Sequence, residues 1–260
     1  MVTPGFDDRS AERKATDERI ASEPPLPRPD LLVGAEGTPL ESASRRRDTP
    51  TQTLSELDRE SIVAHHEAGH AVVGFILGAH VGAITLEALK HSTMEWDGIA
   101  EVDTTGLDDI KIAEIALAGP LAEMKIRCAL ESGIPVELDF TLDKDIVAGM
   151  IAAMDQIARD PHALPKYLNV AIIADGCRYY SRLHLGDCVE DITTAKNRVG
   201  NLHDAATQVL RQMNDARVWN LVRKVASVVL QSKERTLLRK TASAIRVNSV
   251  LSSARDLAAT

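Results

Sequence analysis

Three polar side chains within five residues could bind a metal ion and activate water. The stretch HHEAGHAVVG (residues 65–74) contains His66, Glu67 and His70 among apolar and small residues. Two histidines four residues apart on a helix point the same way, about 6 Å apart, so both imidazoles can bind one cation. The glutamate beside the first histidine can accept a proton from a water on that cation. The His-Glu-x-x-His spacing is therefore typical of zinc-dependent amide hydrolysis.

A catalytic zinc ion usually takes three protein ligands, so the motif needs a third side chain. The metzincin pattern is excluded, because Val73 and Ile76 stand where that class has a glycine and a histidine. Glu123 and two aspartates, Asp143 and Asp145, are the remaining candidates. Aspartates near a helix start are also ordinary as caps and dipole partners, so residue types alone leave all three open.

The competing interpretation of the motif is a helix that binds no metal, since His-Glu-x-x-His also occurs in unrelated proteins. Here the five residues lie in an apolar helix, where two imidazoles and a carboxylate without partners would be costly. A bound ion would satisfy these groups better than water would. The apolar context therefore favours a metal site.

The motif is expected inside a helix of about 24 residues. Thr53 and Glu56 have the spacing of a capping box, and apolar residues then recur at helical intervals until Gly78. Residues 81–89 (VGAITLEAL) and 98–103 (GIAEVD) carry β-branched residues and glycines, which predicts a small β-hairpin or sheet beside the helix.

Helices are predicted for most of the remaining chain. A second helix is expected over residues 107–133, with a kink near Gly119 because Pro120 has no amide hydrogen. A third begins near residues 143–145 and runs through Met154. From Pro165 to the end, three or four amphipathic helices are expected. The predicted fold class is mainly α, with one small sheet.

Composition excludes several classes of protein. The chain has 260 residues, 44% of them hydrophobic, which is enough for a core. A formal net charge of −8 and the lack of a basic face argue against a nucleic-acid partner. Three cysteines without a C-x-x-C spacing argue against a disulfide framework and against a thiolate zinc site. The Gly-x-x-x-x-Gly-Lys phosphate loop is absent, so ATP hydrolysis is not expected.

The sequence also predicts the location and division of the chain. No secretory signal and no run of ~18 apolar residues is found, so a cytoplasmic protein without a membrane span is expected. Residues 1–52 hold seven of the eleven prolines, together with mixed charges. Few apolar residues there could offset the cost of ordering, which predicts a disordered arm. One domain, residues 53–260, is expected to follow.

Four segments, in order, resemble the peptidase domain of the FtsH family of ATP-dependent zinc proteases. They are HHEAGHAVVG (65–74), VGAITL (81–86) with DGIAEV (97–102), IALAGPLAEM (115–124) and DKDIVAG (143–149). They resemble the family's zinc helix, its short hairpin, its LAG-R-AAE helix and its N-D-L-x-x-A-T segment. The resemblance covers residues 53–154, and the helical remainder carries little motif.

The resemblance implies a mostly helical peptidase domain that holds one Zn²⁺ ion through two histidines and one aspartate. By position, His66 and His70 match the histidine ligands, Glu67 the general base and Asp145 the aspartate ligand. Asp143 is the alternative ligand, because a lysine replaces the asparagine that precedes the family's aspartate.

The chain also departs from the family. Pro120 stands in place of the arginine of LAG-R-AAE, so any role of that arginine is missing. The membrane anchor and the AAA+ ATPase module have no counterpart, so neither the hexameric ring nor ATP-driven threading is carried over.

The predicted function is an ATP-independent zinc metalloendopeptidase that hydrolyses peptides or unfolded proteins. The alternative is a catalytically silent, zinc-containing module that binds a peptide or a partner protein through the edge of the hairpin. The intact Glu67 disfavours the silent module, which has no need of a base.

Overall fold

The structure is a computed structural model that describes residues 54–88, 96–144, 149, 151–152, 154–156, 167–184, 188–232 and 236–237. The arm predicted for residues 1–52 lies outside these residues. All described residues belong to one compact unit, which extends from Ser44 to Thr260.

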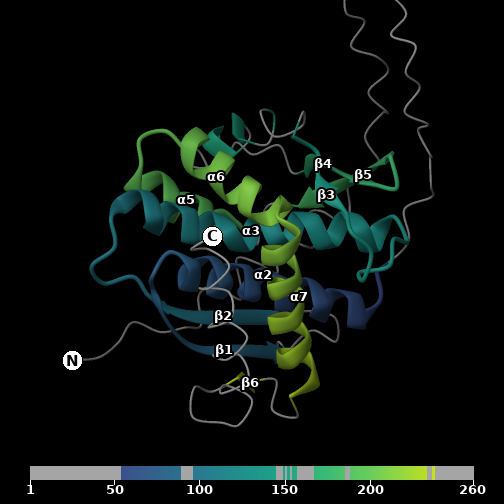
Figure 1. The fold of residues 1–260 in the computed structure, drawn as a ribbon, viewed down its shortest axis with the longest axis horizontal. Coiled ribbons are helices and arrows are strands. Elements are labelled where there is room, and N and C mark those ends of the chain that lie inside the picture. Colours follow the sequence, from purple (N-terminus) through teal and green to yellow (C-terminus); the bar gives the residue numbers. More distant parts are fainter. Residues whose placement is uncertain are drawn as a thin grey trace, which may run out of the picture. The chain divides into compact units, whose positions relative to one another are not determined.

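The fold is mainly helical with small antiparallel sheets, as the sequence predicted (Figure 1). The helices are α2 (Glu56–Ile76), α3 (Asp109–Glu131), α5 (Val189–Arg198), α6 (His203–Asn214) and α7 (Ala216–Gln231). The strands are β1 (His80–Ala88), β2 (Trp96–Asp103), β3 (Thr141–Leu142), β4 (Tyr167–Ala174), β5 (Cys177–His184) and β6 (Thr236–Leu237). None of the helices described is both long and apolar enough to cross a membrane.

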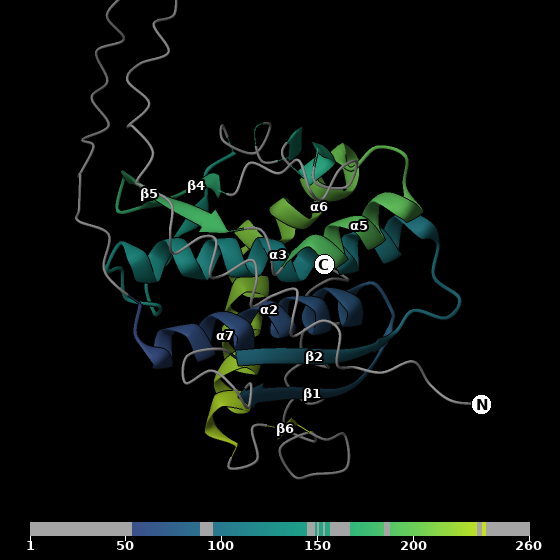
Figure 2. The ribbon, with the colours of Figure 1, turned by 180° about the vertical axis from the view of Figure 1, so that it is seen from behind.

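Helix α2 lies at the centre of this unit. Figures 1 and 2, which view the molecule from opposite sides, both show α2 between α3 and the sheet of β1 and β2. Helix α7 packs across α2, while α5, α6 and the second sheet contact α3. Helices α2 and α3 approach closely at Gly69, where an added Cβ would lie only 2.6 Å from the carbonyl oxygen of Ala118. Glycine therefore permits this contact. The predicted zinc helix is therefore covered on several sides.

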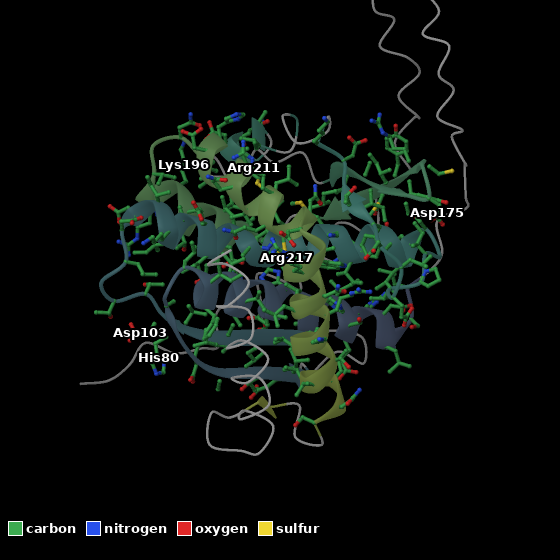
Figure 3. All side chains as sticks on the ribbon, viewed as in Figure 1. His80, Asp103, Asp175, Lys196, Arg211 and Arg217 are labelled. Carbon is green, nitrogen blue, oxygen red and sulfur yellow. The ribbon has the colours of Figure 1, made fainter. Side chains whose placement is uncertain are left out.

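The β-hairpin predicted after the helix of His66 and His70 is confirmed. Strands β1 and β2 pair antiparallel from His80 opposite Asp103 to Ala88 opposite Trp96, and Figure 3 shows His80 and Asp103 close together. The short strand β6 pairs with the other side of β1, in the order β2-β1-β6. Strand β2 is therefore an edge strand among the residues that the structure places.

The prediction that everything after Pro165 is helical is wrong for residues 167–184. Strands β4 and β5 form a second hairpin, and β3 pairs with β4. The two-residue turn between β4 and β5 contains Asp175 and Gly176, whose φ angles are +48° and +71°. Two positive φ angles match the right-handed twist of the flanking strands, and Asp-Gly tolerates them. Asp175 marks the outer end of this hairpin in Figure 3.

The start of α2 differs from the predicted one. The capping box of α2 is formed by Ser55 and Asp58, two residues after the pair that the sequence suggested. Helix α3 runs without interruption through Pro120. The third predicted helix is described only in part, at 144, 149, 151–152 and 154–156.

A buried lysine on α3 is expected to make stability depend on pH. Lys125 is 1% exposed, donates a hydrogen bond to the Met213 carbonyl oxygen and lies 4.3 Å from the centre of the Trp219 ring. Burial, reinforced by the charge of Arg223, lowers the pKa of Lys125 from 10.5 to about 7. Between these two pH values the unfolded chain holds a proton that the folded chain has lost, so the free energy of unfolding rises with pH.

From pH 7 to pH 9 this rise should amount to about 2 kcal/mol. It should largely disappear in Lys125→Met, which keeps the length of the side chain without its charge. Urea unfolding at both pH values measures it, with Lys224→Met, an exposed lysine on α7, as the control. An equal rise in wild type and Lys125→Met would contradict the assignment.

Candidate metal centre

The two histidines of the motif meet at one point between α2 and α3. Their Nε2 atoms lie 3.1 Å apart, and their ring centres lie 4.9 Å apart. His66 is 8% exposed, and the side chain of His70 is 12% exposed. The four-residue spacing on α2 thus brings both imidazoles together, as the sequence predicted.

The hydrogen bonds on Nδ1 fix which ring nitrogens carry hydrogen in the neutral imidazoles. His70 Nδ1 lies 2.7 Å from the carbonyl oxygen of Ile115, which only accepts, so this nitrogen carries the hydrogen. His66 Nδ1 lies 3.0 Å from Glu123 Oε2. Burial alone would raise the pKa of Glu123, but the hydrogen bond from His66 and the charge of Arg127 lower it to about 2, so this carboxylate is also an acceptor. The two Nε2 atoms that face each other are then lone-pair donors.

A third donor atom completes this group. Asp191 Oδ2, in the first turn of α5, lies 3.1 Å from His66 Nε2 and 3.4 Å from His70 Nε2. The three atoms form one of two groups with the spacing of metal ligands among the described residues. Helix α5 brings Asp191 here because it packs against α3.

The spacing of these three atoms fits a zinc ion. Four-coordinate zinc, with bonds to nitrogen and oxygen of 2.0–2.1 Å, holds its ligand atoms about 3.3 Å apart. The separations here are 3.1, 3.1 and 3.4 Å. Two neutral imidazoles and one carboxylate are also donors that zinc accepts.

A glycine on α3 keeps room for an ion beside these atoms. A Cβ at Gly119 would lie 2.2 Å from His70 Nε2 and 2.6 Å from His66 Nε2. The shorter distance is near a zinc–nitrogen bond length and the longer one exceeds it by about 0.5 Å, so that Cβ would crowd the space beside both Nε2 atoms where an ion would bind. Any side chain at residue 119 would therefore compete with a metal ion.

Without a metal ion, a proton on His66 can offset the negative charge of Asp191 at this point. Burial lowers the pKa of His66, but its hydrogen bonds to Asp191, Cys188 and Glu123 outweigh burial and raise it well above its ordinary value. Burial likewise raises the pKa of Asp191, and the hydrogen bonds from the two histidines hold it well below its usual range. Either a proton or a metal ion on His66 Nε2 therefore balances the negative charge of Asp191.

Glu67 lies in the same buried region and faces strand β2. Its carboxylate accepts a hydrogen bond from the backbone amide of Ala100. A Cβ at Gly98 would lie 2.6 Å from Glu67 Cγ, so glycine allows the strand to approach this close. Burial raises the pKa of Glu67, and the nearby charges of His66 and His70 partly offset the increase. The glutamate is thus held between the histidines and the hairpin edge.

The structure describes two of the three predicted candidates for the third ligand. Asp145 lies outside the described residues. Asp143 is buried in an ion pair with Arg178 and belongs to neither ligand group. Glu123 contacts Nδ1 of His66, on the other side of the ring from the shared point. In this structure Glu123 therefore acts as a hydrogen-bond partner of His66 and does not reach the point where the two Nε2 atoms meet.

Asp191 was not among the predicted ligands, although the sequence around it carries a signal. Residues 191–195 read DITTA. This stretch has the aspartate and the alanine of the D-L-x-x-A pattern, and isoleucine in place of its leucine. The segment used for the prediction, DIVAG at 145–149, ends in glycine where the pattern has alanine. The better match was missed because it lies far downstream, beyond the second hairpin.

His65, the other histidine of the motif, points away from the centre. Its Nδ1 lies 2.7 Å from the Ser61 carbonyl oxygen, and its ring lies beside Trp219. Burial lowers the pKa of His65 to about 4. It is therefore a neutral core residue, not a ligand.

No known family model matches this sequence, and no curated protein is significantly similar to it. Any function must therefore be argued from the centre itself.

Asp191 is expected to be required for zinc binding. Asp191→Asn should weaken zinc binding by roughly 100-fold or more, because it removes the anionic donor that the described part of the chain places at the shared point. Asp143→Asn should keep the zinc and lower stability instead, since it breaks the buried ion pair with Arg178. Metal analysis of both variants, with Asp145→Asn alongside, measures this. Zinc loss in Asp145→Asn alone would restore the ligand set that the sequence predicted.

Proposed function

We propose that this protein is an ATP-independent zinc metallopeptidase that hydrolyses peptide bonds in peptides or unfolded proteins. The observation that carries the proposal is that His66 Nε2 and His70 Nε2, on the helix that also carries Glu67, converge with Asp191 Oδ2 of α5 at zinc-ligand spacing. A catalytic role is favoured over metal storage, because storage would not need a general base such as Glu67 on the same helix as the histidines.

Each residue of the centre has a role in this reaction. Bound zinc would lower the pKa of a water molecule toward about 7 and polarise the peptide carbonyl. Glu67 takes the proton of the attacking water on its carboxylate and gives it to the leaving amine nitrogen. The amide of Ala100 holds this carboxylate in place. Glu123 holds the Nδ1 proton of His66, which directs Nε2 toward the shared point.

The edge strand β2 is the proposed docking surface for the substrate. It pairs with β1 on one side and contacts Glu67 through Gly98 and Ala100. An extended peptide that adds to such an edge gains backbone hydrogen bonds independent of its sequence, which suits unfolded substrates. The peptide would then run past the carboxylate of Glu67.

The resemblance to the peptidase domain of the FtsH family supports the same reaction. The proposal keeps the family's ligand types, two histidines and one aspartate, but takes the aspartate from α5. It includes neither ATP nor a hexameric ring.

The test is cleavage of an unfolded protein or a peptide by the purified chain loaded with one equivalent of zinc. Activity is expected in wild type and not in Glu67→Gln. A wild-type chain that binds zinc but cleaves no substrate would contradict the peptidase and leave the silent binding module as the better proposal.

A further inference from the structure

A second group of potential ligands lies on the opposite side of the His66 ring. It consists of His66, Glu123 and Cys188, all three buried, with one ligand atom of each within 4.8 Å of the others. The Cys188 thiol donates a hydrogen bond to Glu123 Oε2 at 3.5 Å, and the same oxygen lies 3.0 Å from His66 Nδ1. The proposed peptidase mechanism gives Cys188 no role.

The start of α5 supplies one residue to each group. Cys188 is the N-cap residue of α5 and Asp191 lies three residues later, so both belong to the first turn. Asp191 approaches His66 Nε2, whereas Cys188 lies on the Nδ1 side with Glu123. A helix N-terminus also favours negative charge, which suits a thiolate as well as a carboxylate.

The distances in the second group fit a metal ion that accepts sulfur. Tetrahedral bonds of 2.3 Å to sulfur and about 2.05 Å to oxygen and nitrogen place sulfur about 3.5 Å and nitrogen about 3.3 Å from the oxygen. The observed separations from Glu123 Oε2 are 3.5 Å to Cys188 Sγ and 3.0 Å to His66 Nδ1. Arg127 occupies the other oxygen, Oε1, at 2.8 Å, so Oε2 is the one that faces the group.

We infer that Cys188, Glu123 and His66 Nδ1 form a second cation site, which takes a thiophilic divalent ion such as Cd²⁺, or Zn²⁺ in excess. The inference rests on the proposed function, because His66 is shared with the first site. Binding releases two protons, one from Cys188 Sγ and one from His66 Nδ1, so a divalent ion leaves the buried net charge unchanged. His66 then lies between two cations and no longer donates to Glu123. Occupation of this site therefore removes the hydrogen bond that orients the first ligand.

The test is a titration of Cd²⁺ into the zinc-loaded protein, followed by near-ultraviolet absorbance and by proton release. Wild type should develop a thiolate-to-cadmium charge-transfer band that saturates at one equivalent, with two protons released. Cys188→Ser should lose the band and still retain the first zinc ion. Cys177→Ser, which removes a partly exposed thiol on β5, should keep the band and serves as the matched control.

Glu123→Gln keeps all three cysteines and should weaken the binding of Cd²⁺ by roughly tenfold or more. It therefore tests the same site even if Cys188→Ser does not fold. A band of unchanged strength in Cys188→Ser, or no band in wild type, would overturn the inference. Zinc content and Glu67-dependent cleavage, measured on the same samples, report separately on the proposed peptidase.

Discussion

Replacement of Glu67 by glutamine is expected to lower the rate of peptide cleavage by roughly 100- to 10,000-fold, with zinc content unchanged. Glutamine has the shape of glutamate and its side-chain oxygen can still accept from the Ala100 amide, so the contact with β2 persists. What is lost is the carboxylate that accepts a proton. Since Glu67 belongs to neither ligand group, the metal should stay.

The measurement combines zinc analysis with cleavage of an unfolded substrate at several substrate concentrations. Loss in the maximal rate with little change in KM would indicate that Glu67 acts in the reaction and not in binding. Glu60→Gln is the matched control, because Glu60 is also a buried glutamate on α2 but lies outside both ligand groups. Full activity in Glu67→Gln would eliminate the mechanism.

Gly119→Ala is expected to abolish zinc binding through a single added methyl group. Helix propensity alone predicts that this substitution stabilises the protein, since alanine is favoured over glycine inside a helix by about 1 kcal/mol. The geometry decides the outcome, because the new Cβ would lie 2.2 and 2.6 Å from the two Nε2 atoms. The imidazoles must move apart, and their Nε2 atoms then no longer meet Asp191 at the spacing of ligands.

Gly149→Ala provides the matched control for this variant. Gly149 is an exposed helical residue, and a Cβ there would meet no atom within 4 Å. This control should bind zinc normally and be equally or slightly more stable. Zinc titration with a competing chelator measures both variants. If Gly119→Ala retained wild-type zinc affinity, the shared point between the histidines would not be the metal site.

Local patterns in the sequence predicted only those residues of the centre that lie together on one helix. His66, Glu67 and His70 lie within five residues, so the helical period alone brings the two histidines together. The third donor depends on how α5 packs against α3, which no local pattern contains. Only the three-dimensional structure therefore shows that Asp191 lies beside the two histidines. Asp143 has a suitable residue type and position in the sequence, but in the structure it pairs with Arg178.

The same limit applies to the fold. The first hairpin was predictable because its two strands flank a turn-like segment shortly after the helix of His66 and His70. In the second hairpin, the apolar run from Val170 to Ala174 fits a buried strand or a short helix equally well. The turn residues Asp175 and Gly176 carried the decisive information, since this pair is typical of a two-residue hairpin loop.

The position of Asp191 has a consequence for how the chain is held together. An ion shared by His70 and Asp191 would close a loop of about 120 residues, which contains α3 and all of the second sheet. Such a closure acts as a reversible cross-link and removes conformational freedom from the unfolded chain, much as a long-range disulfide does. In a chain with no disulfide among the described cysteines, the ion would add a strong link between distant parts of the sequence that packing, hydrogen bonds and ion pairs otherwise hold together.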